Sequence, residues 1–190
     1  MKLLVLSGDG IGPEIMRENL RVLDVLNNKL ALGIDIVQRD IGLKALKVFS
    51  STFPEEVLRL AKVVDAVVLG PVSTFEYPRV EDGGVSPSAT LRIELDLYAN
   101  IRPNYTRENV PSLVKYMDML IVRENTEGFY ADRNMFFGSG EFMPTKDLAL
   151  SVRKISRSGS RRIAFKAFEI SMRRRKKVTI VHKANVLKMT

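Results

Sequence analysis

The chain has 190 residues, with 30 lysines and arginines against 22 aspartates and glutamates, and a formal net charge of +8. Its hydrophobic fraction of 45% and charged fraction of 27% are ordinary for a globular protein and exclude wholesale disorder. It contains no cysteine, which excludes disulfides, thiolate metal ligands and cysteine nucleophiles. The N-terminal apolar run is too short for a signal peptide and no window is long enough to span a membrane, so we expect a cytoplasmic protein.

The first part of the sequence alternates between predicted strands and helices. Apolar runs predict strands at "KLLVL" and "DAVVLG", and alternating polarity predicts another in "GIDIVQRDI". Apolar residues at helical spacing predict one helix from about residue 12 to 32 and a second over 54–64. This order is typical of a parallel sheet with helical crossovers, so we predict the α/β class.

A long loop over 71–88, rich in proline, glycine and serine, follows the carboxyl end of the last of these strands. Open α/β sheets usually place their binding sites at such ends. The later elements are expected in this order: a helix at 88–99, a crossing at 100–103, a strand at 118–125, an irregular aromatic stretch at 128–142, a helix at about 147–174 that is interrupted near Gly159, and a strand at 177–182.

The glycine-rich segment "SGDGIGPE" joins the first predicted strand to the first helix. It differs from the dinucleotide-binding fingerprint, because the third glycine position falls on Pro13, where close helix–strand packing needs glycine or alanine. We interpret it as a tight turn with spare backbone donors.

A basic run extends over 153–177. Such a run is typical either of a nucleic-acid patch or of a solvated helix whose last turn carries cations, which the helix dipole favours. No aromatic residues alternate with the cations as stacking platforms for bases would require. We favour the helix and keep a nucleic-acid-binding module as the alternative.

Three single arginines, Arg92, Arg102 and Arg123, interrupt apolar or helix-forming runs. Arginine is permanently charged and can bind a carboxylate through two parallel hydrogen bonds. Convergence of all three on one cleft predicts a site for a polyanion. The alternative is a set of separate salt bridges to neighbouring acids, namely Glu94, Asp96 and Glu124.

Tyr130 and Lys183 add candidate proton-transfer groups. A lysine near several arginines loses its proton more readily than an isolated one and can act as a base. A nearby tyrosine can donate or relay a proton. Carboxylate-binding cations with a lysine base and a tyrosine acid suit the oxidation of a hydroxy acid.

Four ordered segments, "GDGIGPE", "LRIELDLYANIRP", "IVRENTEGFYA" and "VHKANVLKMT", resemble the β-decarboxylating dehydrogenases that act on isocitrate, 3-isopropylmalate, homoisocitrate, tartrate and D-malate. The resemblance implies an isopropylmalate-dehydrogenase-like fold with a parallel or mixed sheet, flanking helices and the start of a smaller α/β domain. It implies that residues 1–98 belong to a large domain and 99–190 to an incomplete small, dimerising domain.

The resemblance also implies roles for individual residues. The substrate-binding residues are expected to be Ser86, Ser88, Arg92, Arg102 and Arg123. Tyr130 and Lys183 resemble the family's proton-transfer pair, with Lys183 reaching into the partner subunit's site. Asn185 resembles a residue beside the nicotinamide cofactor.

The family's reaction implies NAD or NADP and a divalent Mg²⁺ or Mn²⁺ ion. Members are about twice as long, so we expect the metal-binding aspartates and most of the cofactor site in a C-terminal half outside residues 1–190. The expected partners are a small polycarboxylate and a second copy of the chain, with no nucleic acid and no membrane. The polar "SPSATLR" segment favours isocitrate over isopropylmalate, and it suits malate- or tartrate-like substrates equally well. A non-catalytic regulatory relative of the same family is a further alternative.

Overall fold

The computed structural model describes residues 1–129 and 140–190. The chain divides into two compact units, Met1–Leu91 and Arg92–Thr190, each with its own strands and helices. The division falls within one helix, α4 (Pro87–Glu94). The assignment of residues 1–98 to a large domain and 99–190 to a small one remains a prediction. Among the described residues, no helix is both long enough and apolar enough to cross a membrane.

Unit 1 is built on a three-stranded parallel sheet in the order β2-β1-β3. The strands are β1 (Lys2–Leu6), β2 (Asp35–Arg39) and β3 (Ala66–Leu69). Residues 3–6 of the central strand β1 are buried, as expected of a parallel strand covered by helices on both faces. The predicted α/β class with a parallel sheet and flanking helices is confirmed.

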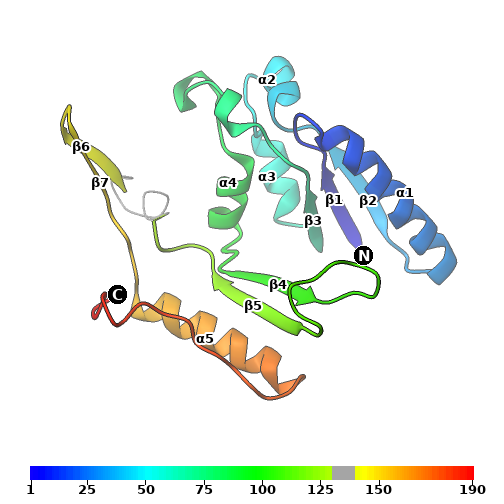
Figure 1. Cartoon of the computed structure of the whole chain (residues 1–190). Coiled ribbons are helices and arrows are strands. Elements are labelled where there is room, and N and C mark those ends of the chain that lie inside the picture. Colours follow the sequence, from blue (N-terminus) through cyan, green and yellow to red (C-terminus); the bar gives the residue numbers. More distant parts are fainter. Residues whose placement is uncertain (130–139) are drawn as a thin grey trace. The chain divides into compact units, whose positions relative to one another are not determined.

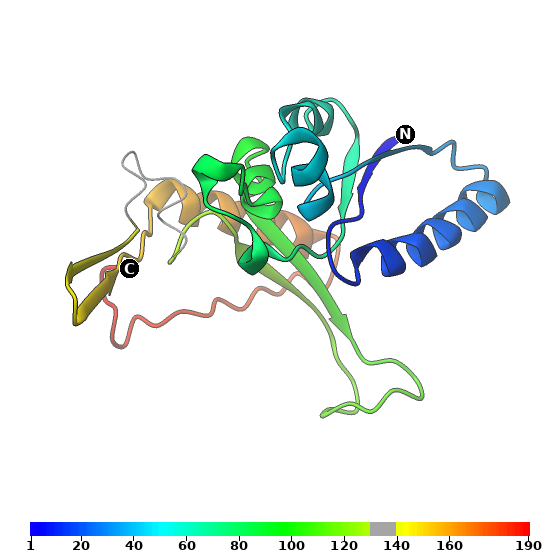
Figure 2. The ribbon, with the colours of Figure 1, turned by 90° about the horizontal axis from the view of Figure 1, so that it is seen from above.

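Helices cover both sides of this sheet (Figures 1 and 2). Helix α1 lies on one side of the strands, and α2 and α3 lie on the other. The bounds are α1 Gly12–Leu30, α2 Leu43–Phe49 and α3 Glu55–Ala61, followed by 3-10 turns η1 Thr74–Glu76 and η2 Val80–Asp82. The sequence prediction missed α2, although it found α3, which has the same length of seven residues.

The core between β1 and α1 is formed by Leu3, Val5 and Met16. The partly buried side chains packed against this cluster are Leu20, Leu23, Ile34, Ile36 and Val68. Since side chains alternate along a strand, Leu4 and Leu6 point to the opposite face, where both are fully buried. Strand β1 therefore contributes buried apolar side chains to both faces of the sheet.

The glycine turn after β1 is organised by the buried carboxylate of Asp9, which is 7% exposed. Its Oδ1 accepts a hydrogen bond from the backbone N–H of Leu43 at 2.7 Å. Its Oδ2 accepts from the N–H of Ser73 at 3.1 Å and from the phenol of Tyr77 at 2.5 Å. One side chain thus joins the turn, the start of α2 and the long 71–88 loop.

Two glycines make room for this arrangement. Gly8 has φ +77°, and a Cβ there would lie 2.0 Å from the carbonyl oxygen of Pro71. Gly42 has φ +73°, and a Cβ there would lie 2.1 Å from Oδ1 of Asp9. The backbone N–H of Asp9 donates to Pro71 and that of Gly12 to Asp9, so both are already used within the unit. The turn is tightly packed, and fewer of its backbone N–H groups are available to a ligand than the sequence analysis expected.

Unit 2 contains two antiparallel strand pairs and one long helix. Strand β4 (Ala99–Tyr105) pairs with β5 (Asp118–Glu124), and β6 (Glu141–Thr145) pairs with β7 (Leu148–Ser151). Helix α5 (Arg157–Met172) packs against β5. The segment at 100–103, expected to be a crossing, is the middle of β4.

Two further predictions for this unit were wrong. The helix expected at 147–174 begins only at Arg157, because Ser156 caps it there and residues 148–151 pair with β6. The strand expected at 177–182 does not form. No described strand pairs with this segment, and an unpaired strand leaves its backbone groups without partners; Val181 is 92% exposed.

Arg162 binds α5 to residues at or next to the start of β4 and the end of β5. One guanidinium nitrogen, Nη1, donates to both carboxylate oxygens of Asp96 at 2.8 Å. The other, Nη2, donates to Oγ1 of Thr126 at 2.8 Å and lies 3.7 Å from Oε1 of Glu124. The guanidinium also lies over the ring of Tyr98, 4.6 Å from its centroid.

Replacing Tyr77 with phenylalanine should lower the free energy of unfolding by about 1.5–3 kcal/mol at pH 7, since a hydrogen bond to a charged acceptor is lost. Burial, followed by the hydrogen bond to Asp9, raises the pKa of Tyr77 well above its usual range. The stabilisation is therefore complete below the unfolded pKa of about 10 and is lost as the pH rises above it, by about 1.4 kcal/mol per pH unit.

Urea denaturation of wild type and Tyr77→Phe at pH 7 and pH 11 measures both effects, and the difference between the proteins should shrink at the higher pH. Tyr116→Phe, at a tyrosine that is 73% exposed, is the control and should behave as wild type. An equal difference at both pH values would contradict the role of the Asp9–Tyr77 bond.

Replacing Arg162 with methionine should destabilise the protein by about 1–3 kcal/mol, because Asp96, Glu124 and Thr126 lose a shared partner that is only partly screened by solvent. Arg161→Met is the matched control. Arg161 lies over the ring of Phe165 on the same helix, and its loss should change the unfolding free energy by less than about 0.5 kcal/mol. Equal losses in urea denaturation would show that Arg162 has no special part in attaching α5.

Candidate substrate site

Strands β4 and β5 bring two of the three predicted arginines together. Asn100 lies opposite Arg123 in the register, and Arg102 lies opposite Ile121. Opposed residues share a face of a sheet, and residues two apart on one strand share it too. Arg102 and Arg123 are therefore diagonal neighbours on one face of the β4–β5 ladder.

Helix α5 packs on the other face of this ladder. Its contacts come from the alternate residues of β5: Nη2 of Arg174, just past the helix, donates to Asp118 at 2.6 Å, and Arg162 approaches Glu124. The face that carries Arg102 and Arg123 is the one that α5 does not cover. Both guanidinium groups thus lie where a small anion can approach without displacing the helix.

Two asparagines extend this cationic face and were missed by the sequence prediction. Nε of Arg102 donates to Oδ1 of Asn100 at 2.9 Å. The Asn100 amide in turn lies 3.5 Å from that of buried Asn125, whose Nδ2 donates to the carbonyl of Leu97 at 3.0 Å. The signal was present as a polar residue at every second position of β4: Asn100, Arg102 and Asn104.

The acids proposed as salt-bridge partners are partly accounted for. Asp96 is held by both bonds from Arg162, and Glu124 accepts from the N–H groups of Thr126 and Glu127 at 2.9 and 2.7 Å. Arg123 and Glu124 are consecutive on β5, so their side chains point to opposite faces. Two of the three acids named in the salt-bridge alternative, Asp96 and Glu124, therefore have other partners in this structure.

Helix α4 carries three further predicted site residues. Ser86 precedes the helix, and its hydroxyl accepts a hydrogen bond from the N–H of Ala89 at 3.4 Å, as a helix cap does. Ser88 and Arg92 are four residues apart in α4 and lie on one side of it. Ser88 and Arg92 can thus contact the same ligand, while Ser86 also fixes where the helix begins.

Of the predicted proton-transfer and cofactor residues, the structure describes Lys183 and Asn185, and it does not bring them to the arginines. Tyr130 lies outside the described residues. Lys183 and Asn185 lie in an exposed turn, where the carbonyl of Lys183 accepts from the N–H groups of Val186 and Leu187. Among the described residues, no hydrogen bond or ion pair joins Lys183 or Asn185 to the cationic face.

The basic run after α5 has a structural use. Arg174 and Arg175 both donate to Asp118 on β5. The hydrogen bond from Arg174 holds the pKa of the Asp118 carboxyl below its usual range. Two of the five cations in 173–177 thus attach the segment after α5 to the ladder; they follow the helix and do not lie in its last turn, where the helix interpretation expected them.

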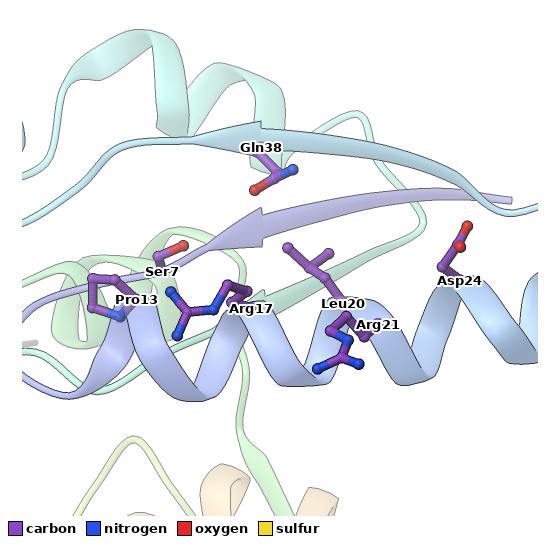
Figure 3. A pocket seen from close by; sticks show the side chains of 7 residues that line it. All are labelled: Ser7, Pro13, Arg17, Leu20, Arg21, Asp24 and Gln38. Carbon is purple, nitrogen blue, oxygen red and sulfur yellow. The ribbon is translucent and has the colours of Figure 1, made fainter.

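Two pockets, one in each unit, are lined by other residues than these. A pocket of about 460 Å³ in unit 1 lies along α1 (Figure 3) and is lined by Ser7, Pro13, Arg17, Leu20, Arg21, Asp24 and Gln38. One of about 380 Å³ in unit 2 is lined by Tyr98, Ser158, Arg161, Arg162, Phe165, Lys166 and Glu169. Neither contains a residue predicted to bind substrate.

The described residues do not fit a metal ion. They contain no group of three histidine, cysteine, aspartate or glutamate side chains placed to hold one. A site for Mg²⁺ or Mn²⁺, which requires several oxygen ligands, is therefore not formed by residues 1–129 and 140–190 as they stand.

Comparison with known proteins agrees with the sequence resemblance. The chain is 38% identical to the 3-isopropylmalate dehydrogenase of Aquifex aeolicus and 34% identical to the homoisocitrate dehydrogenase of Methanocaldococcus jannaschii, matching 100% of this chain and 54% of each relative. The crystal structure of isocitrate dehydrogenase from Methylococcus capsulatus matches with a TM-score of 0.81 and 32% identity, over 100% of this chain and 53% of that one.

The chain thus spans about half the length of the relatives it matches. Within that span the match is nearly complete, because residues 2–190 all fit the family's pattern. The four motifs, the fold and the relatives agree, and the chain belongs to the isocitrate/isopropylmalate dehydrogenase family.

Proposed function

We propose that this chain is the polycarboxylate-binding part of an NAD- or NADP-linked β-decarboxylating dehydrogenase acting on a substituted malate. The observation that carries the proposal is the pair Arg102 and Arg123 on the face of β4–β5 left open by α5. Fixed guanidinium groups bind carboxylates with two parallel hydrogen bonds and need little reorganisation during reaction. Family membership supplies the reaction type.

In this proposal Arg92, Arg102 and Arg123 hold the carboxylates of the substrate. Asn100 is a positioning residue, because it accepts from Nε of Arg102 and leaves the two Nη groups to face the ligand. Arg162 binds Asp96 and approaches Glu124 on the face of the ladder opposite the substrate-binding arginines, and so holds α5 to that face.

The proton movements are assigned to Lys183 and Tyr130. The Lys183 amine accepts the hydroxyl proton of the substrate, and a bound nicotinamide would accept the hydride from the same carbon. The bond to the β-carboxylate then breaks, carbon dioxide departs, and the electron pair stays as an enolate. Tyr130 gives a proton to the enolate carbon. Asn185 is proposed to lie beside the nicotinamide.

The cofactor and the Mg²⁺ or Mn²⁺ ion are assigned to the remainder of the relatives' length, because the described residues form no metal site. The roles of the arginines, Lys183 and Tyr130 in binding and proton transfer belong to this chain's own side chains. A chain that matches only about half of each relative is expected to need that remainder for turnover.

We propose isocitrate as the first choice of substrate and 3-isopropylmalate as the second. Ser88 presents a hydroxyl on the side of α4 that carries Arg92 one turn later, and a hydroxyl suits a polar substituent better than an isopropyl group. The relatives' names do not decide the matter, since identities of 38%, 34% and 32% belong to enzymes named for three different substrates.

We propose that the working form is a homodimer or a higher homo-oligomer. The β6–β7 hairpin is exposed on both faces, with its cross-strand neighbours Phe142 and Leu150 at 47% and 43% exposure. A two-stranded hairpin with uncovered apolar side chains is marginal in water and gains stability when a second surface covers it. A dimer also brings Lys183 of one copy to the arginines of the other.

Steady-state kinetics test the reaction. The chain is assayed alone and combined with a polypeptide covering the unmatched part of the Aquifex aeolicus relative, with Mn²⁺ and either NAD or NADP. The panel of acids is isocitrate, 3-isopropylmalate, homoisocitrate, D-malate and tartrate. We expect reduction of the nicotinamide with isocitrate preferred. A strong preference for 3-isopropylmalate would contradict the argument from Ser88, and turnover of none of these acids would contradict the proposed function.

Mixing two inactive variants tests whether Lys183 acts across a dimer. Lys183→Met and Arg123→Gln, each prepared in the same complemented form, should both lose turnover. When they are mixed in equal amounts and allowed to exchange subunits, mixed dimers regain one intact site, and about a quarter of wild-type activity should return. No recovery, with subunit exchange confirmed by mass-tagged subunits, would place Lys183 in the site of its own subunit.

A further inference from the structure

Buried Asn125 joins the end of β5 to the segment just before β4. The residue is 8% exposed. Its backbone N–H donates to the carbonyl of Tyr98 at 2.9 Å, and its side-chain Nδ2 donates to the carbonyl of Leu97 at 3.0 Å. Buried amides are almost always hydrogen-bonded, so the surroundings decide which way such an amide faces. None of the steps in the proposed reaction uses Asn125.

The carbonyl of Leu97 fixes the direction of the Asn125 amide. A carbonyl oxygen can only accept hydrogen bonds, so it is bound by the NH2 end of the amide. The oxygen end, Oδ1, therefore faces Asn100, whose Nδ2 lies 3.5 Å away. A bond of this length is weak, but Oδ1 is an acceptor only, and it favours the NH2 end of Asn100 on this side.

Asn100 passes this direction on to Arg102. With its Nδ2 toward Asn125, its Oδ1 is turned to Arg102 and accepts a hydrogen bond from Nε at 2.9 Å. The reversed amide would place two donors, Nδ2 and Nε, against each other, because a guanidinium group carries no acceptor. The hydrogen bonds thus run in one direction from the guanidinium group to a backbone carbonyl.

The bond at Nε limits how Arg102 can bind a ligand. A guanidinium group binds a carboxylate through two parallel N–H bonds, which come either from Nε and one Nη or from both Nη groups. Since Nε already donates to Asn100, the two Nη groups are the pair that remains for a carboxylate.

We propose that Asn125 is a positioning residue for substrate binding: acting through Asn100, it orients the guanidinium group of Arg102 so that both Nη groups face a substrate carboxylate. Asn125 itself does not touch the substrate. A side chain that is held in its binding orientation before the ligand arrives loses less conformational entropy on binding. The identity of the ligand rests on the proposed function, whereas the orientation of Arg102 does not.

NMR spectroscopy of the chain without ligand tests the orientation. The Nε–H signal of Arg102 is assigned by its loss in Arg102→Gln. In Asn125→Leu this signal should shift, and the proton should exchange with water about 3- to 10-fold faster, because Asn100 is free to turn its amide. Asn104→Leu is the matched control, since Asn104 lies on the same face and donates to the backbone carbonyl of Arg102.

The control should keep the Nε–H exchange of wild type, and urea denaturation checks that each variant is folded. Asn125→Ser, whose hydroxyl is too short to reach Asn100, gives the same test if leucine does not fit the buried site. An unchanged Nε–H signal in the folded Asn125 variant would overturn the proposal. An equal change in Asn104→Leu would also overturn it, because any loss of an amide on this face would then have the same effect.

Calorimetric titration of the chain with isocitrate tests the consequence for binding. Asn125→Leu should weaken binding by about 5- to 10-fold. In an Arg102→Gln background the same change should cost less than about 2-fold, because the effect of Asn125 passes through Arg102. Equal losses in both backgrounds would make Asn125 merely structural and contradict the proposal. If isocitrate and the other acids of the panel do not bind while the Nε–H signal responds as expected, the proposed function fails and the orientation of Arg102 by Asn125 stands.

Discussion

Alternation of side chains along β4 and β5 separates opposite charges that are neighbours in the sequence. Arg123 and Glu124 are consecutive, yet the strand turns one to the open face and the other toward α5. Asp118 and Glu124, on the covered face, are then bound by Arg174 and Arg162. Arg102 and Arg123 therefore lie together on one face of the ladder, and Asp118 and Glu124 lie on the other face.

In unit 1 a single buried carboxylate, that of Asp9, joins segments that are distant in the sequence. Asp9 binds the backbone of α2 and of the loop after β3, and the Tyr77 phenol closes the same loop onto it. The loop then leads into α4, whose start is capped by Ser86. The first glycine turn and the serines near α4 are thus parts of one connected structure, although about eighty residues separate them in the chain.

Both units have apolar side chains that nothing within their own unit covers. Strand β3 has one neighbour where its composition suits two, α1 has an apolar flank with nothing of its own unit upon it, and the β6–β7 hairpin exposes both of its faces. The relatives that the chain matches are about twice as long as this chain. Exposed apolar surface of this kind costs free energy in water and marks places where other chain segments bind.

The sequence by itself determined the α/β order of unit 1, because β1, α1, β2, α3 and β3 each have a clear apolar period and defined ends. It also determined the family, because the four motifs and their spacing can be read from the sequence without knowing the tertiary structure. It did not reveal α2 or the β6–β7 hairpin. It failed at 177–182, because an apolar run becomes a strand only when another strand pairs with its backbone. Tertiary structure alone decided that Arg102 and Arg123 share a face and that Asp96 binds Arg162, since register and side-chain pairing depend on residues distant in the chain.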